Sequence, residues 1–210
     1  MLKIWGRATS ANVMKLLWCC NEIGIEYERI DLGGEYGGLD DPDYLALNPN
    51  GRIPTIQIEV DGKIFTLWES NTILRYLCSK FSYGTFYPAD PEQRADAERW
   101  MDWQLCHILP GLSPMFFGLL RTPPEQRDHA AIENGRKQNE IYWRILDRHL
   151  ASRPYLCGES MTMAEFSLGI FVYRWLNLPI ERPVLPHLQA WHERLASREA
   201  YRKYVMLPLK

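Results

Sequence analysis

Residues 48–56, Asn-Pro-Asn-Gly-Arg-Ile-Pro-Thr-Ile, form the stretch that decides the fold of this 210-residue chain. Its first four residues favour a tight turn, because proline fixes φ and both Asn and Gly tolerate the left-handed region. Pro54 stands at the mouth of a β-rich run, where its missing N–H costs no ladder hydrogen bond. If the Ile53-Pro54 bond is cis, the preceding backbone N–H and C=O point outward, free to pair with an extended peptide ligand.

A β-hairpin and a helix are predicted directly after this turn. Residues 55–60 and 63–67 are the two strands, and Asp61-Gly62 between them is typical of a two-residue hairpin turn. Glu69 and Ser70 then open a helix. A carboxylate and a hydroxyl beside the free amides of a helix start suit the head group of an amino acid.

The residues before the turn predict a strand, a helix and a second strand, at residues 2–5, 11–23 and 25–32. Ser10 suits the N-cap of this helix and Gly24 suits its C-terminal end. This succession favours a parallel βαβ unit with a right-handed crossover. The glycine-rich segment 33–38 lacks the Gly-Lys-Ser/Thr ending of a phosphate-binding loop, so we predict none there.

The second half of the chain, from residue 92 onward, is predicted to be helical. Pro110 and Pro114 are expected to interrupt the first helix. Thr122 and Pro123 are expected to start the next one, which continues to about residue 151. Residues 186–197 are predicted to form the last helix.

Thr162 and Glu165 have the spacing of a capping box and open a predicted apolar helix through residue 175. Residues 83–91 are rich in turn residues and are predicted to be a linker. The expected division is therefore a first domain at residues 1–82 and a second at residues 92–210.

The composition is that of an ordinary globular chain of one large or two small domains. Hydrophobic residues make up 46% of it and charged residues 24%, which allows a sizeable core. A net charge of −2 supports neither nucleic-acid nor anionic-membrane binding. No apolar run is long enough for a transmembrane helix. The first residues enter a strand directly and show no signal-peptide pattern, so a cytoplasmic location is expected.

The cysteines also point to a reducing compartment. Five are scattered along the chain with no C-x-x-C pair and no zinc-like spacing to His, so no metal is expected. Most lie among apolar residues of predicted helices, where Cys usually acts as a small buried hydrophobe. They are Cys19, Cys20, Cys78, Cys106 and Cys157.

The turn at residues 48–56, combined with Glu69-Ser70, resembles the glutathione-binding half of glutathione transferases. The resemblance implies an α/β thioredoxin-like N-terminal domain followed by an all-α C-terminal helical domain. In that family the residue before the proline, here Ile53, pairs through its backbone with the cysteinyl part of glutathione, and the Glu-Ser pair holds the γ-glutamyl end. The segment before Glu165 resembles the family's N-capping box. The family usually has Asp at that fourth position, and the longer Glu still reaches the cap N–H.

The resemblance also assigns a role to Ser10, which stands where the first loop meets a helix N-terminus. Free N–H groups and the positive end of the helix dipole favour ionisation of a bound thiol there, and a hydroxyl that donates to sulfur favours the thiolate. Serine-type transferases carry a serine at this point, and some bacterial relatives carry Thr with Asn two residues on. Ser10 and Asn12 are therefore the expected thiolate donors, with Thr9 as the alternative donor within the glutathione site. Neither the tyrosine-type nor the cysteine-type pattern fits.

The remaining site residues are expected at the periphery of bound glutathione. Arg52 could pair with the glycine carboxylate of glutathione or be a solvated surface arginine. The hydrophobic co-substrate is expected between the domains. For His107, a packing role is favoured over that of a base. The candidates for the co-substrate pocket are Trp103, His107, Met115, Phe116, Phe117, Leu119 and Arg121.

The resemblance implies a cytosolic transferase of alkyl or aryl groups, active in detoxification, that attacks an electrophilic, partly hydrophobic substrate with the glutathione thiolate. Glutathione is the expected co-substrate and a homodimer the expected assembly, with Trp68, Tyr76 and residues 94–100 as interface candidates. Two alternatives remain open. One is glutathione-dependent disulfide reduction, and the other is a non-catalytic or regulatory protein that binds glutathione.

Overall fold

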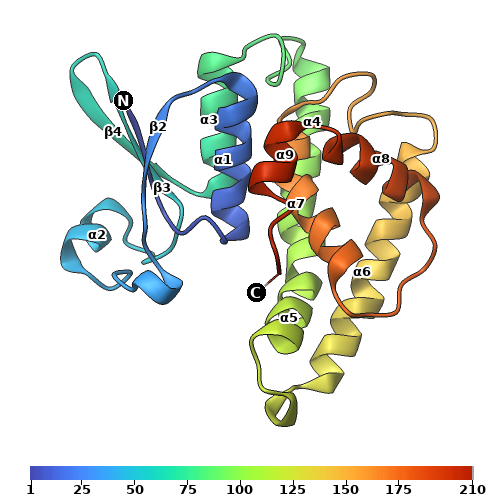
Figure 1. The fold of residues 1–210 in the computed structure, drawn as a ribbon. Coiled ribbons are helices and arrows are strands. Elements are labelled where there is room, and N and C mark those ends of the chain that lie inside the picture. Colours follow the sequence, from blue (N-terminus) through green and yellow to red (C-terminus); the bar gives the residue numbers. More distant parts are fainter. Residues whose placement is uncertain (210) are drawn as a thin grey trace.

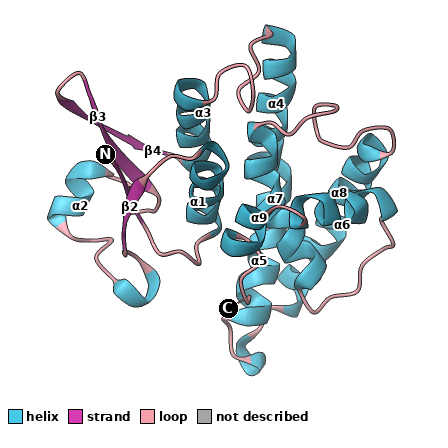
Figure 2. Cartoon of the chain, turned by 45° about the horizontal axis from the view of Figure 1, so that its top comes forward, coloured by secondary structure: helices cyan, strands magenta, loops and turns pink. Residues whose placement is uncertain are grey.

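The computed structural model describes residues 1–209. Figure 1 shows a sheet at one side of the molecule, a bundle of helices at the other, and the paired helices α1 (Ala11–Ile23) and α3 (Ser70–Phe81) between them. Figure 2 shows that the strands are confined to the N-terminal part. The predicted combination of an α/β part and a helical part is confirmed.

Four strands form the sheet in the order β2-β1-β3-β4. β1 (Leu2–Trp5) runs parallel to β2 (Tyr27–Ile30) and antiparallel to β3 (Thr55–Val60), which pairs with β4 (Lys63–Trp68) in a hairpin. Asp61 and Gly62, at φ 51° and 74°, make the hairpin turn as predicted. The connection between β2 and β3 contains a short 3₁₀ turn (Gly34–Tyr36) and α2 (Pro42–Leu47).

Several helices of the C-terminal part begin at a residue whose side chain caps them. Asp90 caps the first of them, and Thr162 and Glu165 form the predicted capping box of α7. The helical elements are α4 (Pro91–Trp103), a π-helical segment η2 (Gln104–Ile108), α5 (Leu109–Leu120), a 3₁₀ turn (Pro124–Gln126), α6 (His129–Leu150), α7 (Met163–Asn177), α8 (Pro186–Ala196) and α9 (Glu199–Tyr204).

Pro186 starts α8 as predicted, whereas the predictions for Pro110, Pro114 and Pro123 were wrong. Pro110 lies where the π-helical segment η2 passes into α5, and Pro114 lies inside α5. Burial of this helix against α6 holds it together across Pro114. Pro123 does not start α6, because Asp128 caps that helix through the Ala131 N–H at 2.9 Å.

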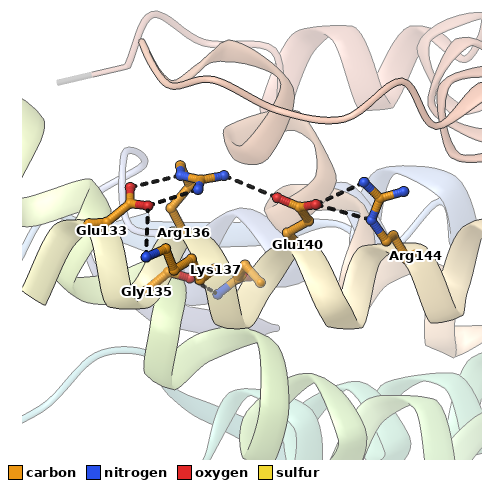
Figure 3. A network of polar contacts seen from close by, with 7 residues as sticks. Glu133, Gly135, Arg136, Lys137, Glu140 and Arg144 are labelled. Carbon is orange, nitrogen blue, oxygen red and sulfur yellow. Dashed lines mark hydrogen bonds and ion pairs between the residues drawn. The ribbon is translucent and has the colours of Figure 1, made fainter.

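Helix α6 has one face packed and one face charged. On its packed face Gly135 approaches Gly111 of α5 so closely that an added Cβ would lie 2.3 Å from the Gly111 carbonyl oxygen. Its exposed face carries a ladder of ion pairs at helical spacing (Figure 3), in which Arg136 joins Glu133 to Glu140. Such a face is typical of a solvated surface.

The helical part and the α/β part share a continuous core. Trp18 of α1 is fully buried and meets Phe166 of α7 and Tyr201 of α9 edge to face, with ring centroids 4.9 and 4.8 Å apart. Gly169 of α7 makes room for the same indole. Helix α1 therefore spans both parts and positions its N-terminal turn at their junction. Within residues 1–209 no helix combines the length and apolar character that crossing a membrane requires.

Candidate active site

The turn before β3 holds one peptide group free of protein partners. The Ile53-Pro54 bond is cis. The Arg52 carbonyl accepts hydrogen bonds from Tyr44 Oη at 2.6 Å and Asn48 Nδ2 at 2.7 Å, which pins the turn. The next backbone groups, the N–H and C=O of Ile53, have no hydrogen-bond partner within residues 1–209. This segment can therefore accept an extended ligand.

The first turn of α1 lies beside this free peptide. Gly6, in the loop before α1, is packed so tightly that an added Cβ would lie 3.1 Å from Ile53 Cβ and 2.5 Å from Val13 Cγ2. Ile53 and the start of α1 therefore converge on Gly6. Gly6 also has φ +144°, a conformation that glycine adopts readily.

Ser10 occupies the N-cap position of α1, but its hydroxyl does not cap the helix. Its backbone carbonyl accepts from Val13 and Met14, whereas Oγ makes no cap hydrogen bond. The predicted N-cap position of Ser10 is confirmed, and the helix is capped there by the backbone alone. The partly exposed hydroxyl and the first amides of α1 are instead left for a ligand, in the field of the positive helix end. Thr9, also partly exposed, precedes it in the same loop.

The N-cap residue of helix α3 is strained. Glu69 has φ +72°, unusual for a residue with a Cβ, and its side chain is exposed and makes no cap hydrogen bond. Such conformations persist where the surroundings enforce them, and they gather at binding sites. Ser70 follows and is buried. Its Oγ donates to Asn12 Oδ1 at 3.2 Å, which ties the start of α3 to the start of α1.

A buried lysine lies under this junction and was not anticipated. Lys15 is fully buried, and its ammonium donates to Ser70 Oγ at 3.3 Å and to Asn71 Oδ1 and Gln104 Oε1 at 3.0 Å each. Burial lowers the pKa of Lys15 to about 7; nearby Glu69 raises it and Arg174 lowers it further. The one signal for it in the sequence is a lysine among the apolar residues of the first predicted helix.

Arginines and phenylalanines gather on the helical side. Arg174 of α7 is buried and its guanidinium carbon lies 4.0 Å from the Phe116 ring centroid, while that of Arg121 lies 5.4 Å from the same ring and 5.1 Å from Phe117. Burial lowers the pKa of Arg174 to about 9, and the charges of Arg121 and Arg7 lower it further. Arg7 belongs to the loop before α1. The three cations therefore lie within each other's field at the junction of the two parts.

The other candidates for the co-substrate pocket lie in different surroundings. Trp103 and His107 stack on each other and pack against Tyr142 of α6. Met115 is fully buried and faces Gly135, whereas Phe117 is 50% exposed. Arg52 has an exposed side chain. Leu119 is partly buried against the core.

Three of the five cysteines, Cys19, Cys20 and Cys78, are buried. Cys19 and Cys78 lie buried side by side, with their sulfurs 3.6 Å apart, and burial raises the pKa of Cys20 to about 12. Cys106 is exposed on η2, contrary to the expectation that the helical cysteines are buried. Among residues 1–209 no cluster of His, Cys, Asp and Glu with the makings of a metal site is found.

Comparison with known proteins agrees with this geometry. The family model for the glutathione S-transferase N-terminal domain matches residues 9–80, and the model for the C-terminal domain matches residues 109–199. The chain is 37% identical to glutathione S-transferase GstB of Escherichia coli K12, with all of both chains covered. It is 30% identical to the disulfide-bond oxidoreductase YfcG of the same organism, covering 92% of this chain and 89% of that one.

A solved structure extends the likeness to three dimensions. A theta class glutathione S-transferase from Xanthomonas axonopodis pv. citri, crystallised with glutathione bound, superposes with a TM-score of 0.94 at 45% identity. The match covers 100% of this chain and 99% of that one. By its sequence, its two matched domains and its fold, the chain belongs to the glutathione S-transferase family.

Proposed function

We propose that this glutathione S-transferase forms the glutathione thiolate at the first turn of α1 and adds it to an electrophilic, partly hydrophobic substrate. The observation that carries the proposal is the Ser10 hydroxyl, which has no cap hydrogen bond and stands beside the free first amides of α1. A hydroxyl that donates to sulfur, together with the helix dipole, stabilises thiolate over thiol. Asn12 Nδ2 supplies a second donor, because Ser70 occupies only its Oδ1.

The rest of glutathione extends away from Ser10 over the backbone of Ile53 and the N-terminus of α3. The Ile53 N–H and C=O pair with the cysteinyl part, since neither is used by the protein. The γ-glutamyl carboxylate meets the N-terminus of α3 at Ser70, and its ammonium meets the Glu69 carboxylate. Arg52 is exposed and can reach the glycine carboxylate.

The electrophile occupies the junction lined by Phe116, Phe117 and Arg121. The half-exposed Phe117 ring supplies apolar surface with Arg121 over it, and Arg174 stands over the buried Phe116 ring behind it. When a thiolate displaces a leaving group, negative charge develops on the acceptor and the departing atom. A fixed cation beside that charge lowers the barrier, because it needs no reorganisation during the step.

Conjugation is preferred over glutathione-dependent disulfide reduction. A serine, not a cysteine, stands at the activating position, and the cysteines of α1 are buried. We further propose a cytoplasmic homodimer with a role in detoxification. Ile64 and Trp68 share one face of the edge strand β4, are 63% and 38% exposed, and suit a partner surface.

Three assays on the purified protein test the proposal. Retention on immobilised glutathione tests binding, a dinitrochlorobenzene tests conjugation, and a hydroxyethyl mixed disulfide tests reduction. The variant Ser10→Ala should lower kcat for conjugation by about 10²–10³, as expected for the loss of one preorganised donor, with little change in glutathione affinity. The matched control Ser79→Ala changes an exposed serine of α3 and should leave both parameters unchanged. Equal losses of turnover and affinity in Ser10→Ala would refute the thiolate role.

A further inference from the structure

The Lys15 ammonium is paired with neutral oxygens alone. Its three N–H groups match three acceptors, Ser70 Oγ, Asn71 Oδ1 and Gln104 Oε1. No ion pair to a carboxylate is formed within residues 1–209, and the Phe171 ring centroid lies 5.2 Å away. The geometry thus satisfies a protonated lysine completely, although the group is fully buried.

This arrangement is costly for the fold. A buried charge without a countercharge is destabilising, and an apolar side chain of similar length would fill the same space. Gln104 turns its oxygen toward Lys15, and its Nε2 is then buried without a partner among residues 1–209. Because packing alone would favour an apolar residue here, the stability of the fold does not account for a lysine at this position.

Ser70 connects this cation to the candidate site. Lys15 donates to Ser70 Oγ, so one lone pair of that oxygen is used from behind. The Ser70 hydroxyl hydrogen therefore points forward, at present to Asn12 Oδ1. Ser167 Oγ, 3.1 Å from both Asn71 Oδ1 and Gln104 Oε1, closes the network from α7. The hydroxyl is thus held as a donor toward any anion at the start of α3.

We propose that Lys15 is a positioning residue for the γ-glutamyl carboxylate of glutathione, orienting the Ser70 hydroxyl toward it and supplying a positive charge behind the N-terminus of α3. This inference rests on the proposed function, since it takes the γ-glutamyl end to bind at Ser70. It adds to that function a proton linkage, because a carboxylate on Ser70 favours the ammonium form of Lys15.

The charges that face Lys15 determine how its protonation depends on binding of the ligand carboxylate. Glu69, at the start of α3, favours the ammonium, and Arg174 of α7 disfavours it. From η2 and α7 the contacting groups, Gln104 and Ser167, are neutral. With a pKa of about 7, Lys15 is mostly neutral just above neutrality in the free protein. A ligand carboxylate opposes Arg174, so binding should draw a proton into the protein.

Calorimetric titration with S-methylglutathione tests this without interference from thiol ionisation. Enthalpies measured near pH 7.5 in buffers of different ionisation enthalpy give the protons taken up. If the carboxylate favours the ammonium tenfold, the protonated fraction rises from about one quarter to about three quarters, an uptake of about half a proton. Lys15→Met should abolish this uptake and weaken binding about tenfold near pH 6.5, equivalent to about 1.4 kcal/mol. Lys80→Met, in the last turn of α3, is the control and should match the wild type.

A second ligand separates positioning from mere support of the fold. The analogue with γ-aminobutyryl in place of γ-glutamyl lacks the carboxylate proposed to face Ser70. The wild type should bind it without proton uptake, and Lys15→Met should not weaken its binding further. This arm needs only wild-type protein should the variant fail to fold. Equal proton uptake with both ligands, or equal loss of affinity for both in Lys15→Met, overturns the proposal. Failure of the wild type to bind S-methylglutathione would instead overturn the proposed function.

Discussion

The buried Lys15 makes the stability of the protein depend on pH, and the substitution Lys15→Met removes this dependence. The pKa of Lys15 is about 7 in the folded protein against 10.5 for the ordinary side chain. Between these values the unfolded chain binds more protons than the folded one, so stability rises with pH. The cost of the buried charge is therefore complete below pH 7 and is relieved as pH approaches 10.5.

The size of the effect follows from the same two values. A lowering from 10.5 to about 7 corresponds to about 5 kcal/mol of cost near pH 6, since each pKa unit is worth 1.36 kcal/mol. Near pH 9 the cost has fallen to about 2 kcal/mol. Lys15→Met removes this term and leaves the acceptors of the ammonium unpaired, a loss that does not depend on pH. Relative to the wild type, Lys15→Met should therefore lose about 3 kcal/mol between about pH 6 and pH 9.

Urea unfolding followed by tryptophan fluorescence at both pH values measures the difference. Groups that titrate in both proteins cancel in the comparison. Lys80→Met, an exposed lysine of the same domain, is the control and should show a pH-independent offset. A stability difference between Lys15→Met and wild type that stays constant within about 0.5 kcal/mol across this range would mean that Lys15 keeps its ordinary pKa in the fold.

Three further predictions concern the helical part and the acceptor pocket. Glu165→Ala should lower the free energy of unfolding in urea by about 3–5 kcal/mol, because it leaves the buried N–H groups of Thr162 and Leu156, each 2.7 Å from the carboxylate, without a partner. The control Glu159→Ala changes an exposed residue and should cost under about 0.5 kcal/mol. Equal effects of the two substitutions would contradict the capping role. Gly135→Ala should destabilise by about 2 kcal/mol or more, since its Cβ would lie 2.3 Å from a carbonyl oxygen of α5, and a gain of stability in thermal unfolding would show that the helices separate easily. Arg121→Ala should lower kcat/KM for a dinitrochlorobenzene about tenfold at unchanged glutathione affinity, and unchanged steady-state kinetics would place the electrophile elsewhere.

The α/β part was predicted closely because its signals are local. Asp61-Gly62 specifies the hairpin turn by its backbone preferences alone, and Gly24 ends α1 at φ +81° for the same reason. The capping box of Thr162 and Glu165 is equally local and is present. Such features need no knowledge of the tertiary structure.

The errors arose where packing overrides local preference. Pro114 remains inside α5 because that helix is held by burial against its neighbours, which no proline rule contains. The short last helix, α9, was not predicted. Six residues are too few to form a stable helix alone, and the packing of Tyr201 against Trp18 supports this one. Asp128, not Thr122, caps α6, and both residue types are acceptable caps.

The candidate site divides in the same way. Ser10, Ile53 and Ser70 could be proposed from short motifs, whereas nothing in sequence spacing places Lys15 under Ser70 or Arg174 over Phe116. These pairs are brought together by the packing of α1 against α3 and of α7 against α5. Trp103 and His107, which are aromatic residues at helical spacing, both pack against Tyr142 of α6.

Thiolate formation beside Ser10 is tested by the pH titration of the thiolate absorbance of glutathione bound to the purified protein. A free cysteine thiol has a pKa of about 8.5. We expect a thiol pKa in the complex well below that value, and its return toward that value in Ser10→Ala with glutathione still bound. A bound thiol that titrates near 8.5 in the wild type, or at the same lowered value with and without the Ser10 hydroxyl, would show that Ser10 does not stabilise the thiolate.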